Sequence, residues 1–141
     1  MIRLTKVFHF ETAHAIHGYD GKCKNIHGHS YELHVTICGE TPKTDFIPAP
    51  GFIVDFKEIK QAGQEVLQLM DHKIVLSETY LTMHPELKLH ENLVIWDYEP
   101  TAENILLHIK RIFDRNLPAT VKPVHLKLYE TKDSYAEWLA D

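Results

Sequence analysis

Residues 23–29, Cys23-Lys24-Asn25-Ile26-His27-Gly28-His29, are the stretch of this sequence that decides the fold prediction. In an extended strand, residues two apart point to the same face of the sheet, so His27 and His29 can converge on one metal ion. Gly28, between them, has no side chain to crowd the approach of that ion. The stretch therefore predicts a metal site at the beginning of a strand.

A third histidine ends the strand that is predicted upstream. Apolar and polar residues alternate over residues 2–14, and His14 shares the parity of the apolar set. A second strand is predicted over residues 29–39, and its apolar residues share the parity of His27 and His29. Three imidazoles with one open ligand position are typical of catalytic rather than structural zinc, so the pattern indicates an enzyme.

The thiol of Cys23 allows three interpretations. It can be a fourth zinc ligand that closes a structural site, a base or nucleophile beside the metal, or an unpaired thiol in a loop. Lys22 and Lys24 flank it, and nearby positive charge increases the thiolate fraction of a cysteine. Spacing alone does not separate the three interpretations.

Two further positions offer carboxylates to a site. Asp71 and His72 end a predicted helix, where they can form a proton-transfer pair or where His72 can simply interact with the helix dipole. Glu130 lies on the buried parity at the end of the last predicted strand. A buried carboxylate needs a partner, which is either a ligand with two N–H groups or a salt bridge, unless the strand end is exposed.

The rest of the chain predicts an α+β protein whose strands are antiparallel. Asp55 caps a helix that ends near Asp71, and Thr101 caps a second helix that Leu117 and Pro118 stop. The other predicted elements are strands at residues 52–54 and 124–128 and loops at residues 41–45 and 48–51.

Two segments have a weaker pattern. Residues 74–76 and 93–96 can be short strands or packed loop segments. We expect the tail, residues 132–141, to pack on a neighbouring subunit. A sheet of so few strands has open edges that subunit contacts would cover, so a homo-oligomer is expected.

The composition indicates one globular domain over residues 1–141. The formal charge of −5 at pH 7 argues against a nucleic-acid partner, which would need a basic face. No stretch resembles a signal peptide or approaches the roughly 18 apolar residues that span a membrane. Two cysteines make no disulfide framework, so a cytoplasmic protein without a membrane partner is expected.

Taken together, these features resemble the 6-pyruvoyl-tetrahydropterin synthase family, which includes the 6-carboxy-tetrahydropterin synthases of queuosine biosynthesis. The resemblance rests, in chain order, on residues 10–14, the Cys23-x3-His27-Gly28-His29 motif, Asp71-His72, residues 100–104 and Glu130-Thr131. It implies a tunnelling fold, in which a four-stranded antiparallel sheet carries two helices on one face. It also implies trimers whose strands close into a barrel, and hexamers made of two trimers.

The resemblance further implies the roles of individual residues. Zinc would be held by His14, His27 and His29. Proton transfer would fall to Cys23, Asp71 and His72, in an active site between subunits. Glu130 would anchor the pterin ring of 7,8-dihydroneopterin triphosphate, and Lys22 and Lys24 are our candidates for contacts to its triphosphate.

Two products are compatible with these residues. We expect 6-carboxy-5,6,7,8-tetrahydropterin, formed with loss of acetaldehyde and triphosphate, because the short chain fits the bacterial type. The alternative product is 6-pyruvoyl-tetrahydropterin. A non-catalytic zinc-stabilised oligomer and a different zinc hydrolase or lyase are rival interpretations. The stretch 73–99 is longer than the compact bacterial pattern and is the main departure from it.

Overall fold

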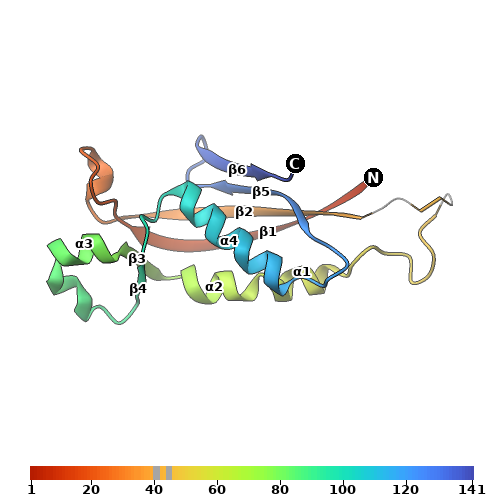
Figure 1. Cartoon of the computed structure of the whole chain (residues 1–141), viewed down its shortest axis with the longest axis horizontal. Helices are drawn as coiled ribbons and strands as arrows, with labels where there is room; N and C mark the ends of the chain where they lie inside the picture. The colour runs from red at the N-terminus through yellow and green to blue at the C-terminus, as the bar shows by residue number, and fades with distance from the viewer. Residues whose placement is uncertain (40–41, 44–45) are drawn as a thin grey trace.

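The computed structural model describes residues 1–39, 42–43 and 46–141, and a curled, mixed sheet forms the centre of this part of the chain (Figure 1). Six strands are described, in the order β4-β3-β1-β2-β5-β6. Their bounds are β1 Ile2–His14, β2 His27–Gly39, β3 Lys73–Ser77, β4 Leu93–Trp96, β5 Pro123–Tyr129 and β6 Tyr135–Leu139. Of the loop predicted at 41–45, residues 41, 44 and 45 lie outside the described residues.

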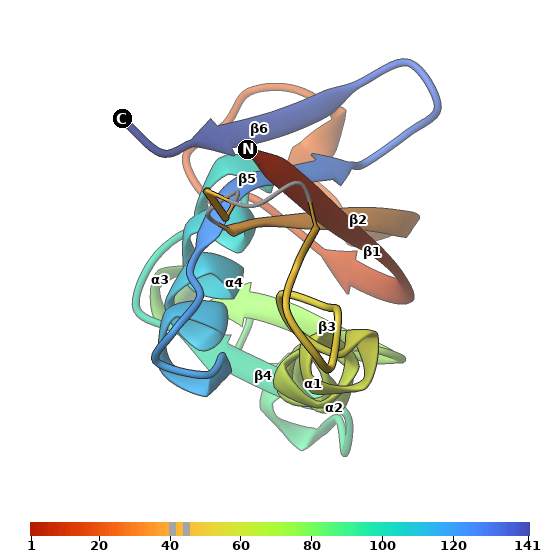
Figure 2. The same cartoon turned by 90° about the vertical axis from the view of Figure 1, so that its right-hand side faces the viewer.

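Helices cover one face of the sheet, which Figure 2 shows end-on. The bounds are α1 Phe56–Ala62, α2 Gln64–Met70, α3 Glu78–Met83 and α4 Ala102–Asn116, with short 3-10 helices η1 Lys22–Lys24 and η2 Pro85–Leu89. Both predicted caps are confirmed. Asp55 forms a capping box with Glu58, and the hydroxyl of Thr101 accepts a hydrogen bond from the Asn104 backbone N–H.

Strands β1 and β2 pair antiparallel without a register shift from Ile2, opposite Gly39, to His14, opposite His27. Their inward residues are buried under the helices, as the alternation predicted. This register confirms that the three histidines lie on the core-facing side. It also fixes them at the end of the sheet where the two strands are joined by residues 15–26.

The helix predicted over residues 55–71 is divided into α1 and α2 at Gly63. A Cβ atom at Gly63 would lie 2.4 Å from the Phe8 ring and 3.1 Å from the Phe113 ring. The absent side chain therefore allows the helix backbone to approach the sheet closely. Both phenylalanines belong to the core that joins sheet and helices.

The prediction of a four-stranded antiparallel sheet is wrong in number and in direction. Among the described residues, β3 pairs parallel to β1, and β4 pairs parallel to β3. Residues 52–54 form no strand. Instead, Ile53 packs over Gly39, and buried Val54 leads into the cap of α1.

The tail pairs within its own chain, and its packing on a neighbouring subunit stays a prediction. Residues 135–139 form β6, which pairs antiparallel with β5 of the same chain. Ala136 and Trp138 pack against the core, while Tyr135 and Leu139 face outward, which is the period-two pattern of a half-buried strand. In the described residues, no helix has the length and apolar character needed to cross a membrane.

Candidate metal centre and pocket

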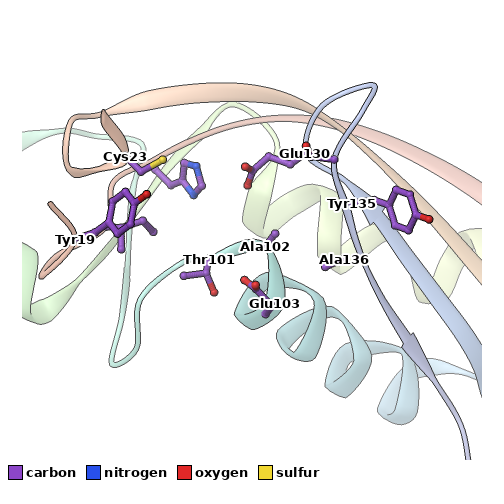
Figure 3. Close-up of a pocket in the computed structure, with 11 residues that line it drawn as sticks. Tyr19, Cys23, Thr101, Ala102, Glu103, Glu130, Tyr135 and Ala136 are labelled. Carbon is purple, nitrogen blue, oxygen red and sulfur yellow. The ribbon is translucent and has the colours of Figure 1, made fainter. Parts of the chain in front are cut away.

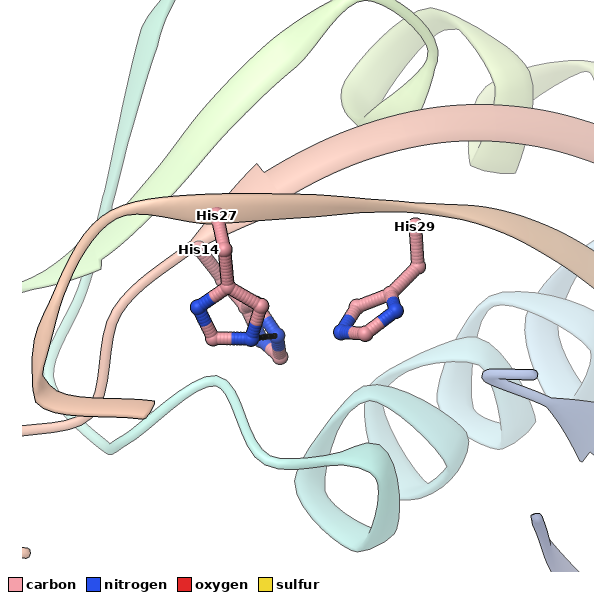
Figure 4. A group of neighbouring side chains, drawn as sticks. All are labelled: His14, His27 and His29. Carbon is pink, nitrogen blue, oxygen red and sulfur yellow. Dashed lines mark hydrogen bonds between the residues drawn. The ribbon is translucent and has the colours of Figure 1, made fainter. Parts of the chain in front are cut away.

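The β1–β2 hairpin brings His14, His27 and His29 together (Figure 4). His14 and His27 are direct cross-strand partners, and His29 lies opposite Thr12, two residues along the strand. One ring nitrogen from each residue lies within 4.8 Å of the other two. The sequence prediction that these three side chains converge is confirmed.

The second nitrogen of two of these rings is held by a backbone carbonyl. His14 Nδ1 lies 2.6 Å from the Pro100 oxygen, and His27 Nδ1 lies 2.8 Å from the Asn25 oxygen. A carbonyl only accepts hydrogen bonds, so each Nδ1 carries the proton and donates it. In the neutral rings, both Nε2 atoms therefore present lone pairs, and they face each other at 3.1 Å (Figure 4).

Burial favours the neutral form of two of the three rings. It lowers the pKa of His14, although the Pro100 carbonyl and the charge of Glu130 oppose the shift. Burial also lowers the pKa of His29, whose Nε2 is buried without a hydrogen-bond partner among the described residues. Neutral imidazoles with converging lone pairs are the donor set that zinc and similar divalent ions take. The residues present therefore fit a metal ion.

Beside the histidines lies a pocket of about 420 Å³ (Figure 3). The wall is built from the β1–β2 connection, the first turn of α4 and the β5–β6 turn. Its lining residues are His14, Ile16, Tyr19, Cys23, Thr101, Ala102, Glu103, Glu130, Ser134, Tyr135 and Ala136. The pocket thus brings a metal ligand, a thiol and carboxylates together.

Cys23 lines this pocket from η1, but it is not part of the metal cluster. In the described part of the chain, the side chains close enough to share one ion are the three histidines alone. Three protein ligands are the number found in catalytic zinc sites, whereas structural sites have four. This geometry argues against Cys23 as a fourth ligand, and it leaves the interpretations of a base or nucleophile beside the metal and of an unpaired thiol in a loop.

Glu130 also lines the pocket and is held by a buried partner that sequence reasoning missed. The hydroxyl of Tyr31 donates to Glu130 Oε2 at 3.2 Å, and Glu130 Oε1 lies 3.6 Å from His29 Nε2. Tyr31 is 1% exposed, and both burial and the charge of Glu130 raise its pKa. A signal for this role existed, because Tyr31 continues the parity of His27 and His29.

Asp71 and His72 lie elsewhere. The Glu11 backbone N–H donates to Asp71 Oδ1 at 2.9 Å and lowers the pKa of that carboxyl group, and Asp71 Oδ2 lies 3.0 Å from His72 Nδ1. His72 is 81% exposed and lines a second hollow with Glu11 and Ser30. His29 also contributes to this second hollow, but neither Asp71 nor His72 is among the described residues that line the pocket beside the histidines.

Lys22 and Lys24 flank Cys23 on η1, and both are exposed. They do not belong to the described lining of the pocket. The structure therefore places both ammonium groups near the cysteine along the chain but not in the wall of the pocket.

The fold and site define an α+β protein with a cluster of three histidines that could hold a metal ion at one end of a curled sheet. The family model for 6-pyruvoyl tetrahydropterin synthase matches residues 3–140. The chain belongs to this family.

Curated relatives align with this chain over nearly their whole length. The 6-carboxy-5,6,7,8-tetrahydropterin synthase of Rickettsia typhi is 32% identical, over 97% of this chain and 99% of the relative. The enzyme of the same name from Haemophilus influenzae is 30% identical, over 98% and 99%.

Solved structures share the fold. Caenorhabditis elegans 6-pyruvoyl tetrahydropterin synthase has a TM-score of 0.72 at 21% identity, covering 99% of this chain and 96% of that one. An uncharacterized protein from Wolinella succinogenes has a TM-score of 0.80 at 17% identity, covering 99% and 98%.

Proposed function

We propose that this protein is a zinc-dependent 6-carboxy-5,6,7,8-tetrahydropterin synthase. In this proposal, it converts 7,8-dihydroneopterin triphosphate with loss of acetaldehyde and triphosphate, as a step of queuosine biosynthesis. The observation that carries it is the three-histidine cluster, which lies beside a pocket lined by His14, Cys23 and Glu130. The shared name of the full-length relatives supports the product.

His14, His27 and His29 would hold the zinc ion. Zinc at this position supplies Lewis acidity, which polarises a carbonyl and acidifies hydroxyl groups of the substrate. The carbonyls of Pro100 and Asn25 orient two of the ligands and keep their Nε2 atoms unprotonated.

Glu130 would anchor the pterin ring through its N–H groups. Tyr31 occupies one carboxylate oxygen, which fixes the orientation of the group toward the pocket. The Cys23 thiolate would then remove a proton from the substrate side chain, since both residues line the same pocket.

The Asp71–His72 pair would complete the site from a second subunit. In the described residues, β1 pairs with β3 only at residues 12–14, so the rest of that edge is unpaired, and β6 is the opposite edge of the antiparallel part. Pairing of these edges between copies would close the sheets into a trimeric barrel, and two trimers would give a hexamer. Asp71 would orient His72 for proton exchange.

The ammonium groups of Lys22 and Lys24 would contact the triphosphate. Both are exposed and flank the residue that lines the pocket. Replacing both by methionine should raise KM and reduce its dependence on salt. An unchanged KM would overturn this assignment.

The test is to incubate the zinc-loaded protein with 7,8-dihydroneopterin triphosphate and to identify the products by mass spectrometry. We expect 6-carboxy-tetrahydropterin and acetaldehyde. The pyruvoyl compound would assign the protein to the alternative branch, which the name of the family model favours. Unchanged substrate would leave the non-catalytic zinc oligomer as the explanation.

A further inference from the structure

Tyr80 and Glu99 lie outside the pocket and hold the loop that carries Cys23. We propose that both are positioning residues that set where the Cys23 thiol stands relative to the histidine cluster. We call residues 15–26, between β1 and β2, the cysteine loop. The inference rests on the proposed function, in which Cys23 transfers a proton.

The cysteine loop closes on itself at Cys23. The Ile16 backbone N–H donates to the Cys23 carbonyl at 2.8 Å, and Ile16, Tyr19 and Cys23 all line the pocket. The regular structure described in the loop is the three-residue η1, so contacts from outside determine where it lies. Two such contacts reach His17 and Lys24, which are next to the two residues joined by this hydrogen bond.

The first contact comes from Glu99. Its Oε2 atom accepts a hydrogen bond from the His17 backbone N–H at 2.8 Å. Glu99 is itself fixed at the start of α4, because its carbonyl accepts from the Thr101 N–H and the Asn104 amide, both at 2.9 Å. The backbone that carries this carboxylate is therefore held in place beside the loop.

The residue after Glu99 reaches the metal cluster. The Pro100 carbonyl accepts from His14 Nδ1 at 2.6 Å. Two consecutive residues thus hold the loop that carries the thiol and the ring of a metal ligand. This arrangement ties the position of the cysteine loop to that of His14.

The second contact comes from Tyr80 on α3. Its hydroxyl donates to the Lys24 carbonyl at 3.0 Å, one residue beyond Cys23. Tyr80 is 6% exposed and packs in a small core cluster with Ala15, Leu76 and Leu81. Because Ala15 follows the metal ligand His14, this cluster also joins the loop to the sheet.

Both anchors come from residues 73–99. Tyr80 is carried by α3 and Glu99 follows β4, and their contacts fall on the two residues next to the Ile16–Cys23 closure. A small displacement of a catalytic group costs a large part of the rate, so this stretch acts on the reaction without touching the substrate.

The test measures the thiol directly in the zinc-loaded full-length protein. The rate of alkylation by iodoacetamide at Cys23 and Cys38, resolved by peptide mass spectrometry, is compared among wild type, Glu99→Ala, Glu99→Gln and Tyr80→Phe. We expect Glu99→Ala and Tyr80→Phe to change the Cys23 rate by about threefold or more and to lower kcat about tenfold, with KM and zinc content unchanged. Glu99→Gln keeps an acceptor oxygen for His17 and should stay close to wild type.

Two controls remove comparable hydrogen bonds elsewhere. Glu65→Ala loses the contacts to Arg115 and Asn116, and Tyr98→Phe loses the contact to His108. Both should leave the Cys23 rate unchanged, and the Cys38 rate should be constant throughout.

The inference would be overturned if Glu99→Ala and Tyr80→Phe both kept the wild-type rate of Cys23 alkylation and the wild-type kcat. It would also be overturned if Glu99→Gln changed these two quantities as much as Glu99→Ala does. Tyr80→Phe keeps the buried ring, so it tests the inference even where Glu99→Ala does not fold. Altered Cys23 alkylation in a protein that turns over no dihydroneopterin triphosphate would support the positioning role and overturn the proposed function.

Discussion

His14 and His27 face each other across the β1–β2 pair with their Nε2 atoms 3.1 Å apart, while a backbone carbonyl holds the Nδ1 atom of each ring. Two lone pairs at that distance repel, so the arrangement is stable only with a cation or a proton between them. Burial of His14 disfavours the proton. The hairpin geometry therefore favours a metal ion between the two Nε2 atoms.

Removing one of the three imidazoles should remove the metal. We expect His29→Ala to lower zinc affinity by a factor of about 100 or more, since an altered outer-shell partner alone typically costs 10–100-fold. Zinc content after dialysis against a chelator measures the loss. The matched control is His90→Gln in an exposed turn, which should bind zinc like wild type. Full retention of zinc by His29→Ala would contradict the three-histidine site.

Cys23 should be dispensable for the metal. Because its side chain is not among those that can share one ion, Cys23→Ala should keep one zinc per subunit and an unchanged thermal midpoint. Product formation should fall by at least about 100-fold, in the range of a lost general base. Zinc release accompanied by unfolding would instead identify the thiol as a fourth, structural ligand.

The buried hydroxyl of Tyr31 should matter for substrate binding. Tyr31→Phe keeps the ring stacked on Phe10 but removes the donor to Glu130. We expect KM to rise several-fold and the free energy of unfolding to fall by about 0.5–1.5 kcal/mol, the net contribution of one hydrogen bond, because the Glu130 carboxylate lines the pocket and water can replace the lost donor. Steady-state kinetics and urea titration check both. An unaltered KM would show that Glu130 needs no support from Tyr31.

His108 should make stability depend on pH. Burial first, and the charge of Arg111 second, lower its pKa from the usual 6.5, and Tyr98 is hydrogen-bonded to its Nδ1. The unfolded chain therefore binds a proton near pH 6.5 that the folded chain binds only at lower pH. The free energy of unfolding should fall as pH drops below about 6.5, by at most about 1.4 kcal/mol per pH unit for this one group.

The comparison variant for that effect is His108→Gln, measured by urea unfolding between pH 8 and 5 with zinc bound. Its stability should decline less steeply with acid than that of wild type. Parallel curves for the two proteins would rule out a contribution from His108.

The long strands, both main helices and the histidine cluster could be predicted because each depends on local periodicity. Alternation over 13 residues of β1 determines which face His14 occupies, whatever the rest of the chain does. The sequence pattern predicted a strand wrongly at residues 52–54. Three apolar residues there look like a strand, but they form none, and Ile53 instead packs over Gly39.

The parallel strands and the supports of the site could not be predicted from periodicity. β3 and β4 are short apolar runs. β3 pairs with β1 across about 60 residues of chain, and β4 pairs with β3 across about 20. The bonds from Glu99 to His17 and from Tyr80 to Lys24 likewise join a side chain to distant backbone. A sequence pattern does not record which backbone group will come to lie beside a given side chain.

The uninterrupted register of the β1–β2 hairpin has a consequence for how the protein folds. Sliding one strand by a single residue would turn His27 and His29 to the face of the sheet opposite His14. A hairpin that is one residue out of register therefore cannot offer the ion three donors. A metal that binds during folding would favour the native alignment of the two longest strands over these one-residue shifts.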